Sequence, residues 1–265
     1  MGDAHAYRVI MASRLRSQLA YPTSFAFDVV NQLVYGLIEF IELYAVFHNV
    51  DSLAGLGWSQ ALLVMALSRL AFQTGDLFVG HLDQMPAYLR QGTLETFLIR
   101  PLPVLAQVIT SDISLRRVSR IVLFGGFTAL ALARLELTWT PAAVVLLLAA
   151  LLGGSLITAA MFITAGTAQF WLIEGGEAAN AFTYGGAYVA QFPAGVLPVG
   201  VRVFYTAVLP VTFIGYLPTV TLLGLADPLV PSWFGWLTLP VGLTFLTLSL
   251  AAWQFGVRHY QGGGG

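Results

Sequence analysis

Long apolar stretches recur along the chain and are separated by shorter segments that carry its polar residues. A helix needs about 20 mostly apolar residues to cross the hydrocarbon core of a bilayer. Six segments meet that requirement. We therefore predict transmembrane helices at residues 25–47, 58–80, 118–135, 141–170, 177–192 and 236–257.

A further apolar stretch, residues 201–225, does not have the pattern of a straight crossing. Pro210 and Pro218 interrupt it, and more prolines flank it on both sides. Because proline removes a hydrogen bond from the helical ladder, a pair of short re-entrant or interfacial helices fits better than a seventh span. A straight crossing would instead place the carboxyl terminus on the opposite side of the membrane.

Composition supports the same fold class. Of the 265 residues, 57% are hydrophobic and 9% charged, whereas a soluble domain has about 25% charged residues. Lipid must therefore cover much of the surface, and we predict an all-α integral membrane protein. The chain has no cysteine and no lysine, so it lacks both thiolate ligands and a nucleotide-binding P-loop. Its histidines lack ligand spacing. We expect no metal site, no cofactor bound by this chain and no nucleic-acid partner.

The arginines set the predicted orientation, because cytoplasmic loops are enriched in basic residues. With the amino terminus inside, nine arginines fall on the cytoplasmic side and two outside, and both termini are cytoplasmic. The nine are Arg8, Arg14, Arg16, Arg90, Arg100, Arg116, Arg117, Arg120 and Arg258; the two are Arg134 and Arg202. We divide the chain into an amino-terminal interfacial helix at 1–22, one six-span domain at 23–260 and a flexible tail at 261–265.

The first predicted span carries a polar stripe. At 100° per residue, its polar side chains fall within an arc of about 100°, and such groups cost at least about 2.5 kcal/mol each in hydrocarbon. The stripe must face protein or water, as a wall of a substrate pathway or as a packing seam between helices or subunits. Its members are Asp28, Asn31, Gln32, Tyr35, Glu39 and Glu42.

In the second predicted span, Arg69, Gln73 and Asp76 share one face. An antiparallel arrangement puts Arg69 near the depth of Glu39, so we predict that Arg69 pairs with Glu39 or Glu42; pairing with Asp76 on the same helix is the alternative. These two spans hold three more acids than bases, a surplus that favours a cationic amphipathic solute.

The cytoplasmic segment 81–103 is too polar to span and too apolar to be a loose loop. Its pattern predicts a short helix, a break at Gly92, a second amphipathic turn and a stop at Pro101 and Pro103. Such a segment suits a groove on a cytoplasmic partner, although a plain connector on the membrane surface has a similar composition.

Three motifs then resemble those of ABC-2 family permeases, in the branch of viologen-exporter-like permeases. The first is RQGTLETFLIRPL at residues 90–102. The second joins QFPAGVLP at 191–198 to VLPVTFIGYLP at 208–218, with Gln191 and Ala194 departing from the family pattern. The third is WQFGVRHY at 253–260, where His259 replaces a basic residue.

The resemblance implies a permease that dimerises with an identical or sister chain, with its first and fifth spans at the dimer interface. A dimer of cytoplasmic ATP-binding-cassette ATPase subunits, which hold the ATP and Mg²⁺, would drive export of an organic cation. This chain would be a transport subunit, not an enzyme, in the bacterial plasma membrane. Coupling would use Asp83, Tyr88, Arg90, Gly92, Leu94, Glu95, Arg100 and Pro101, within residues 83–100 and the proline that follows. An extracellular cap would include Pro193, Pro198, Pro210, Tyr216 and Pro218.

Two other classes of protein remain as alternatives. A proton-coupled secondary transporter would use Asp28, Glu39 or Glu42 as a relay, and an internal repeat would favour it, but the sequence shows none. An intramembrane enzyme would need a cluster of nucleophile, base or metal ligands, which the sequence also lacks.

Overall fold

The computed structural model describes residues 22–111, 116–172 and 175–260, and this part of the chain is helical, with no β-strand. The predicted interfacial helix at 1–22 and the tail at 261–265 lie outside the described residues, apart from Pro22, which begins the first helix. The helices are α2 (Pro22–Asn49), α3 (Trp58–Val79), α4 (Met85–Arg90), α5 (Thr93–Leu98), α6 (Val104–Ser111), α7 (Arg116–Arg134), α8 (Pro141–Ala168), α9 (Gly176–Asn180), α10 (Gly186–Ala190), α11 (Val199–Ala207), α12 (Tyr216–Leu222) and α13 (Thr238–His259).

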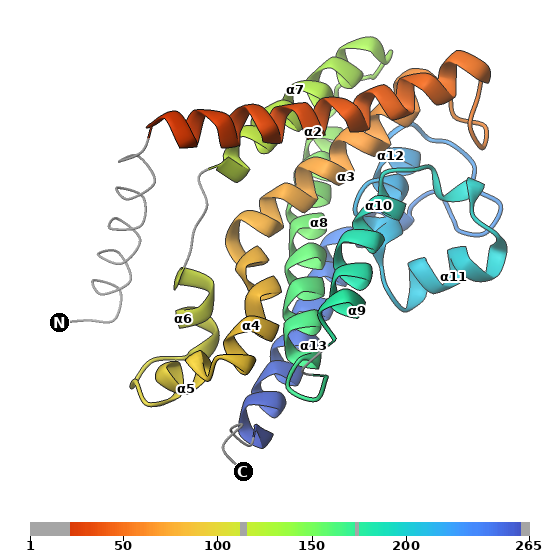
Figure 1. Cartoon of the computed structure of the whole chain (residues 1–265). Coiled ribbons are helices and arrows are strands. Elements are labelled where there is room, and N and C mark those ends of the chain that lie inside the picture. The colour runs from red at the N-terminus through yellow and green to blue at the C-terminus, as the bar shows by residue number, and fades with distance from the viewer. Residues whose placement is uncertain (1–21, 112–115, 173–174, 261–265) are drawn as a thin grey trace.

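Helix α8 lies at the centre of the bundle, between α3 and α13 (Figure 1). Small residues on α8 allow this close approach, as its sequence predicts. A Cβ atom on Gly153 would lie 2.6 Å from the backbone of Thr238 in α13, and one on Gly154 would lie 2.9 Å from Ala71 Cβ in α3. The three helices therefore form one tightly packed layer to which the others attach.

Four helical segments of the described chain are long and apolar enough to cross a membrane: Pro22–Asn49, Trp58–Arg90, Pro141–Ala168 and Phe234–His259. The other two predicted spans are present as helices with different properties. Helix α7 begins with Arg116 and Arg117, and Arg120 follows one turn later. Helices α9 and α10 are joined by a π-helical turn at Ala181–Gly185, and the three pieces have five residues each. The all-helical membrane fold is confirmed, and the full six-span layout stays a prediction.

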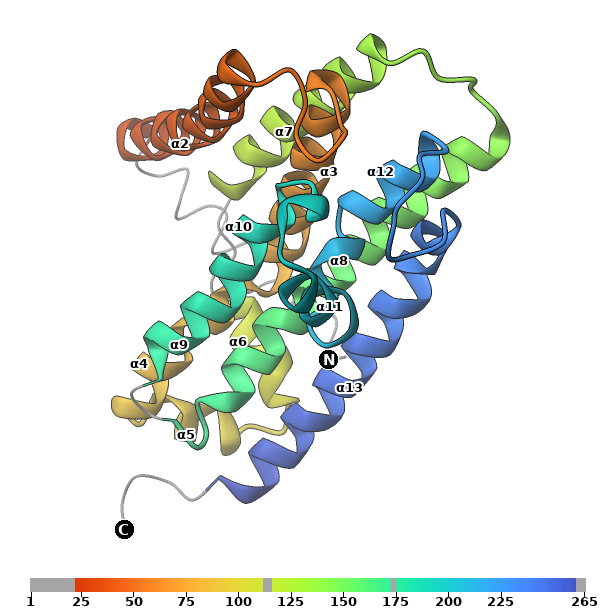
Figure 2. The same ribbon diagram turned by 90° about the vertical axis from the view of Figure 1, so that its right-hand side faces the viewer.

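Helix α2 lies on the outside of the bundle and packs mainly on α7 (Figures 1 and 2). Within α2 only Gly36 and Leu43 are buried. Gly36 permits the contact, because a Cβ there would lie 2.5 Å from the Leu123 side chain. At its carboxyl end, Phe40 and Phe47 pack edge-on against Trp58 at the start of α3. Most of α2 is thus left uncovered by the described chain.

The two ends of the bundle carry different structures. Helices α4, α5 and α6 lie at the end where α13 finishes, whereas α12 lies near the opposite end, with α11 beside it (Figure 1). The chain leaves α10 and enters α13 in the same half of the molecule, so residues 193–237 do not cross the bundle (Figure 2). As predicted, this segment forms short helices instead of one straight helix. Its entry into the membrane stays a prediction.

The contact between α8 and α13 gives a first testable prediction. Replacing Gly153 with Ala would force its Cβ against the backbone of Thr238, and overpacking of this kind costs about 1–3 kcal/mol. We expect Gly153→Ala to lower the thermal unfolding midpoint of the detergent-solubilised chain by several degrees. The matched control is Gly126→Ala in α7, where a Cβ meets nothing within 4 Å, so this change should be neutral or slightly stabilising. Equal effects of the two substitutions would contradict the packing argument.

Candidate functional site

A cluster of buried charges joins α2, α3 and α7. Arg69 Nε lies 3.0 Å from Glu39 Oε2, and Arg120 Nη2 donates a hydrogen bond of 2.8 Å to Glu39 Oε1. The predicted pairing of Arg69 with Glu39 is therefore confirmed. The alternative pairing with Asp76 is not formed, because Asp76 Oδ2 lies 3.0 Å from Arg117 Nε on α7. Each buried acid thus has an arginine partner.

Arg117 and Arg120 are members of this cluster that the sequence analysis assigned only to the cytoplasmic side. Counting them changes the charge of the site. Among the side chains that the structure describes, Arg69, Arg117 and Arg120 contribute three positive charges against Glu39 and Asp76, which leaves one positive charge in excess. The predicted surplus of three acids was counted over the first two spans only. When the arginines of α7 are included, the buried face no longer has an excess of acids. Glu39 and Asp76 therefore give no reason to expect that this buried face attracts a cationic solute.

The face of α3 that carries Arg69, Gln73 and Asp76 is buried throughout. Arg69 Nε also donates to Gln191 Oε1 at 3.1 Å, which links α3 to the turn after α10. The Nε2 atoms of Gln73 and Gln191 are both buried and lack a hydrogen-bond partner within the described chain. An unsatisfied buried donor is costly. We therefore expect water or a polar group of a solute to bind to these two amides beside Arg69.

The polar stripe of α2 is divided between two environments. Gln32 and Glu39 are partly buried at the edge of the contact with α7, whereas the other four members are exposed. The exposed members form what we call the outer polar edge of α2: Asp28, Asn31, Tyr35 and Glu42. Tyr35 is 59% exposed. The described residues therefore cover only one side of the stripe.

The segment between α3 and α7 has the predicted form. A 3₁₀ turn at Gly80–Gln84 leads into α4, and Gly92 adopts φ +67°, the left-handed conformation that favours glycine, before α5 begins. Leu94 and Phe97 of α5 are buried and hold it against the bundle. Gln107 of α6, which the sequence analysis did not single out, donates to Phe97 O and Leu102 O at 2.9 and 2.8 Å.

The remaining predicted coupling residues fall into two groups. Asp83 and Tyr88 make contacts within the chain: Tyr184 of the π-helical turn donates to Asp83 Oδ2 at 3.2 Å, and the Tyr88 hydroxyl lies 2.5 Å from His81 Nε2. The others form an exposed surface together with Ile99, which is 84% exposed. That surface consists of Arg90, Glu95, Ile99, Arg100 and Pro101, and we call it the α4–α5 surface.

An ion pair that the sequence analysis missed organises residues 193–237. Arg202 of α11 pairs with Asp227, whose side chain is fully buried. The Tyr216 hydroxyl donates to the same carboxylate at 2.7 Å, and the amides of Leu229 and Val230 donate to its other oxygen at 2.8 and 3.1 Å. Asp227 thus joins α11, α12 and the following loop.

The predicted cap prolines lie at the ends of the short helices in this segment. Pro193 and Pro198 directly precede a 3₁₀ turn and α11, and Pro210 precedes the next 3₁₀ turn. Pro218 lies in the first turn of α12, where a missing N–H is tolerated. Each proline therefore starts a helical turn, and none interrupts one.

Comparison with known families identifies the chain. The profile of the family described as "ABC-2 family transporter protein" matches residues 33–264. The chain belongs to the ABC-2 transporter family. It is thus a multi-pass membrane transport subunit, not an enzyme, and permeases of this family generally pair with a cytoplasmic ATP-binding subunit. Searches of the curated proteins and of the solved structures found no match. The assignment to the viologen-exporter branch stays a prediction.

The shared carboxylate in this ABC-2 permease gives a second testable prediction. Glu39→Gln removes the only negative charge that Arg69 and Arg120 contact within the described residues, and breaking a buried pair costs about 3–5 kcal/mol. We expect the thermal unfolding midpoint of the solubilised chain to fall by at least about 6 °C. Glu42→Gln, one turn along the same helix but exposed, is the control and should change stability by about 0.5 kcal/mol or less. Similar shifts for both variants would show that the cluster does not hold α2 in place.

Proposed function

We propose that this ABC-2 permease is the membrane-spanning subunit of an exporter that moves an amphipathic solute out of the cytoplasm. A separate pair of subunits binds and hydrolyses ATP with Mg²⁺, and a second permease, identical or a sister chain, completes the transporter in the bacterial plasma membrane. The observation that carries the proposal is the outer polar edge of α2, which is exposed on a membrane-length helix. Both termini lie on the cytoplasmic side.

Glu42 and Asn31 on that edge would be costly to expose to lipid. An ionised group at the centre of a bilayer costs at least about 2.5 kcal/mol, and the described chain leaves these side chains uncovered. A second permease packed along α2, with a polar path between the chains, removes this cost. The two interpretations of the stripe, a pathway wall and a subunit seam, then describe the same surface.

The surroundings of the path define the class of solute. The outer polar edge lies beside apolar side chains of α2 such as Ile38 and Val34, which are also exposed. A solute that moves along this boundary meets both kinds of surface, so an amphipathic molecule fits. Any preference for a cation comes from Glu42 on the outer edge, which is exposed. Glu39 and Asp76 do not contribute, because their charges are paired with arginines.

The α4–α5 surface is the proposed contact with the ATPase. Leu94 and Phe97 anchor it to the bundle, so a push on the exposed Ile99 and Arg100 is transmitted to α3 and α8. The hydrogen bond between Asp83 and Tyr184 links the same segment to the π-helical turn. ATP binding in the partner would close its dimer, move this surface and shift the population between inward-open and outward-open packings.

A proton-coupled secondary transporter remains the alternative function, and two observations weigh against it. Its proton relay needs carboxylates that are free to bind and release protons, whereas Glu39, one of the three predicted relay acids, contacts two arginines. Membership of the ABC-2 family also favours an ATP-driven mechanism.

The pathway is tested by thiol labelling in membranes, a method that suits a chain without cysteine. Only the thiolate reacts rapidly with maleimides, and water is needed to form it. We expect Tyr35→Cys to react with a water-soluble maleimide at least ten times faster than Leu37→Cys. Both positions are exposed in the single chain, at 59% and 43%, but Leu37 lies on the apolar side of α2.

The same two variants test the subunit seam. If two identical chains meet along α2, oxidation should cross-link Tyr35→Cys into a disulfide dimer and leave Leu37→Cys monomeric. A sister-chain arrangement would give rapid labelling at Tyr35→Cys without a dimer between copies. Equal labelling at the two positions would contradict the proposed pathway in either arrangement.

Coupling is tested at the tip of the α4–α5 surface. Ile99→Asp places a charge where an apolar contact with the ATPase is proposed, and we expect co-purification of the ATPase to fall at least tenfold. Val196→Asp makes the same change at an exposed residue of the 3₁₀ turn that precedes α11 and serves as the control. Undiminished co-purification with Ile99→Asp, or an equal loss with Val196→Asp, would contradict this contact.

A further inference from the structure

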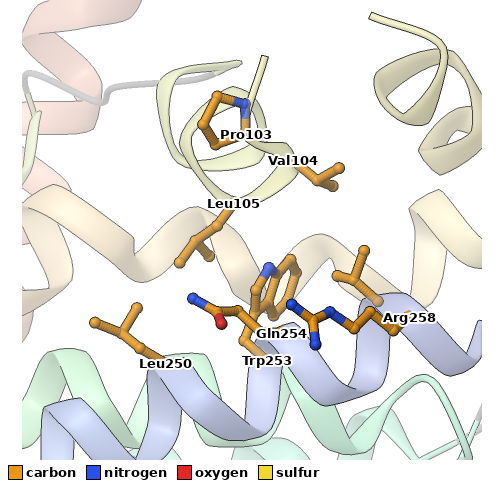
Figure 3. A pocket seen from close by; sticks show the side chains of 8 residues that line it. Pro103, Val104, Leu105, Leu250, Trp253, Gln254 and Arg258 are labelled. Atoms are coloured by element: carbon orange, nitrogen blue, oxygen red, sulfur yellow. The ribbon is translucent and has the colours of Figure 1, made fainter. Parts of the chain in front are cut away.

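A groove of about 320 Å³ lies between the start of α6 and the last turns of α13. This volume falls within the range of about 300–1,000 Å³ that is typical of small-molecule sites. Most of its lining is apolar, from Val104 and Leu105 on one side and Leu250, Trp253 and Val257 on the other (Figure 3). None of its lining residues belongs to the charged cluster around Glu39.

The polar side chains that line the groove are Gln254 and Arg258 of α13, and Arg258 marks one of its ends (Figure 3). Arg258 lies there in the last turn of α13, opposite Val104 of α6, whereas Leu250 lies at the other end (Figure 3). Arg258 is exposed and forms no salt bridge within the described residues. None of the described residues that line the groove is acidic. An unpaired guanidinium at the end of an apolar groove is complementary to a ligand with one anionic end and one apolar end.

The partial charges at the helix ends near Arg258 change the electrostatic potential there but leave it positive. The carboxyl end of α13 carries about half a negative charge, but the imidazole of His259 donates to Phe255 O in the last turn at 2.8 Å. The first turn of α6, at Val104 and Leu105, contributes its partial positive charge to the same groove. The local field near Arg258 therefore remains positive.

We propose that this groove binds an anionic phospholipid, with the headgroup phosphate at Arg258 and an acyl chain along Leu105, Leu250 and Trp253. The inner leaflet placement rests on the orientation given in the proposed function, because α13 ends on the side of the α4–α5 surface (Figure 1). Anionic lipids are concentrated in that leaflet, and basic pockets between helices on the cytoplasmic side bind their headgroups. Trp253 agrees with this depth, since indoles favour the membrane interface.

A bound lipid would have a structural consequence for coupling. Only Leu102 separates Pro103, Val104 and Leu105 from Arg100 and Pro101 of the α4–α5 surface. A lipid wedged between α6 and α13 would fix the distance between this surface and the last helix. The lipid would therefore act as a removable packing element next to the ATPase contact.

The experiment uses the purified full chain in detergent, titrated with phosphatidylglycerol or phosphatidylcholine that carry the same acyl chains. Bound lipid is counted by native mass spectrometry. We expect the chain to bind phosphatidylglycerol more tightly than phosphatidylcholine. Arg258→Gln should weaken phosphatidylglycerol about fivefold, the effect of one basic residue near a membrane surface, and leave phosphatidylcholine unchanged. Arg134→Gln, at an exposed arginine that ends α7, is the control and should change neither lipid.

A second variant tests the apolar part of the groove. Leu105→Trp fills it while keeping Arg258, so binding of both lipids should fall. Equal lipid binding by the original chain, Arg258→Gln and Leu105→Trp would overturn the proposal. Displacement of the lipid by millimolar inorganic phosphate or glycerol 1-phosphate would also overturn it, because the site would then be one for small anions. The measurement needs no ATPase, so its outcome is independent of the coupling test.

Discussion

The carboxylate of Glu39, shared between Arg69 and Arg120, is the interaction on which the architecture depends. A charge at membrane depth must have partners, because hydrocarbon offers it no solvation. Here the partners come from α3 and α7, so the need to neutralise one acid fixes the position of α2 relative to two other helices. The same constraint determines which side of α2 turns inward. Its remaining polar side chains, including Tyr35 and Glu42, are then left on an outer edge that lipid cannot cover well.

Sequence alone predicted those features that depend on long-range regularity. The helix pattern located α2, α3, α8 and α13 to within a few residues, and the antiparallel register of neighbouring spans brought Arg69 to Glu39. Arg117 and Arg120 were missed as partners of the acids. Arginines at the start of a span are expected on the cytoplasmic side in any case, so their presence did not indicate a buried ion pair. Asp227 and Gln107 were missed for another reason. Asp227 lies in a loop and Gln107 in the eight-residue helix α6, and neither segment has a periodicity that indicates a buried residue holding several segments together.

The two ends of the bundle are stabilised by different chemistry. Near one end, the Arg202–Asp227 pair and Tyr216 link α11 to α12 through charge-assisted contacts. At the other end, α4, α5 and α6 rely on neutral hydrogen bonds, such as those of Gln107, and on buried Leu94 and Phe97. Neutral hydrogen bonds each contribute about 1 kcal/mol, less than a buried ion pair costs to break. The segment proposed to meet the ATPase is thus the more easily displaced, as a moving part requires.

As a predicted span, the short helix formed by α9, the π-helical turn and α10 has a consequence for the surrounding lipid. Its three five-residue pieces extend about 22 Å at 1.5 Å per residue, against a hydrocarbon thickness of about 30 Å. Such hydrophobic mismatch costs a fraction of a kcal/mol for each ångström, and the bilayer relieves it by becoming thinner beside the helix. Lipid next to this helix would be locally compressed, and a solute leaving the transporter there would have a shorter apolar distance to travel.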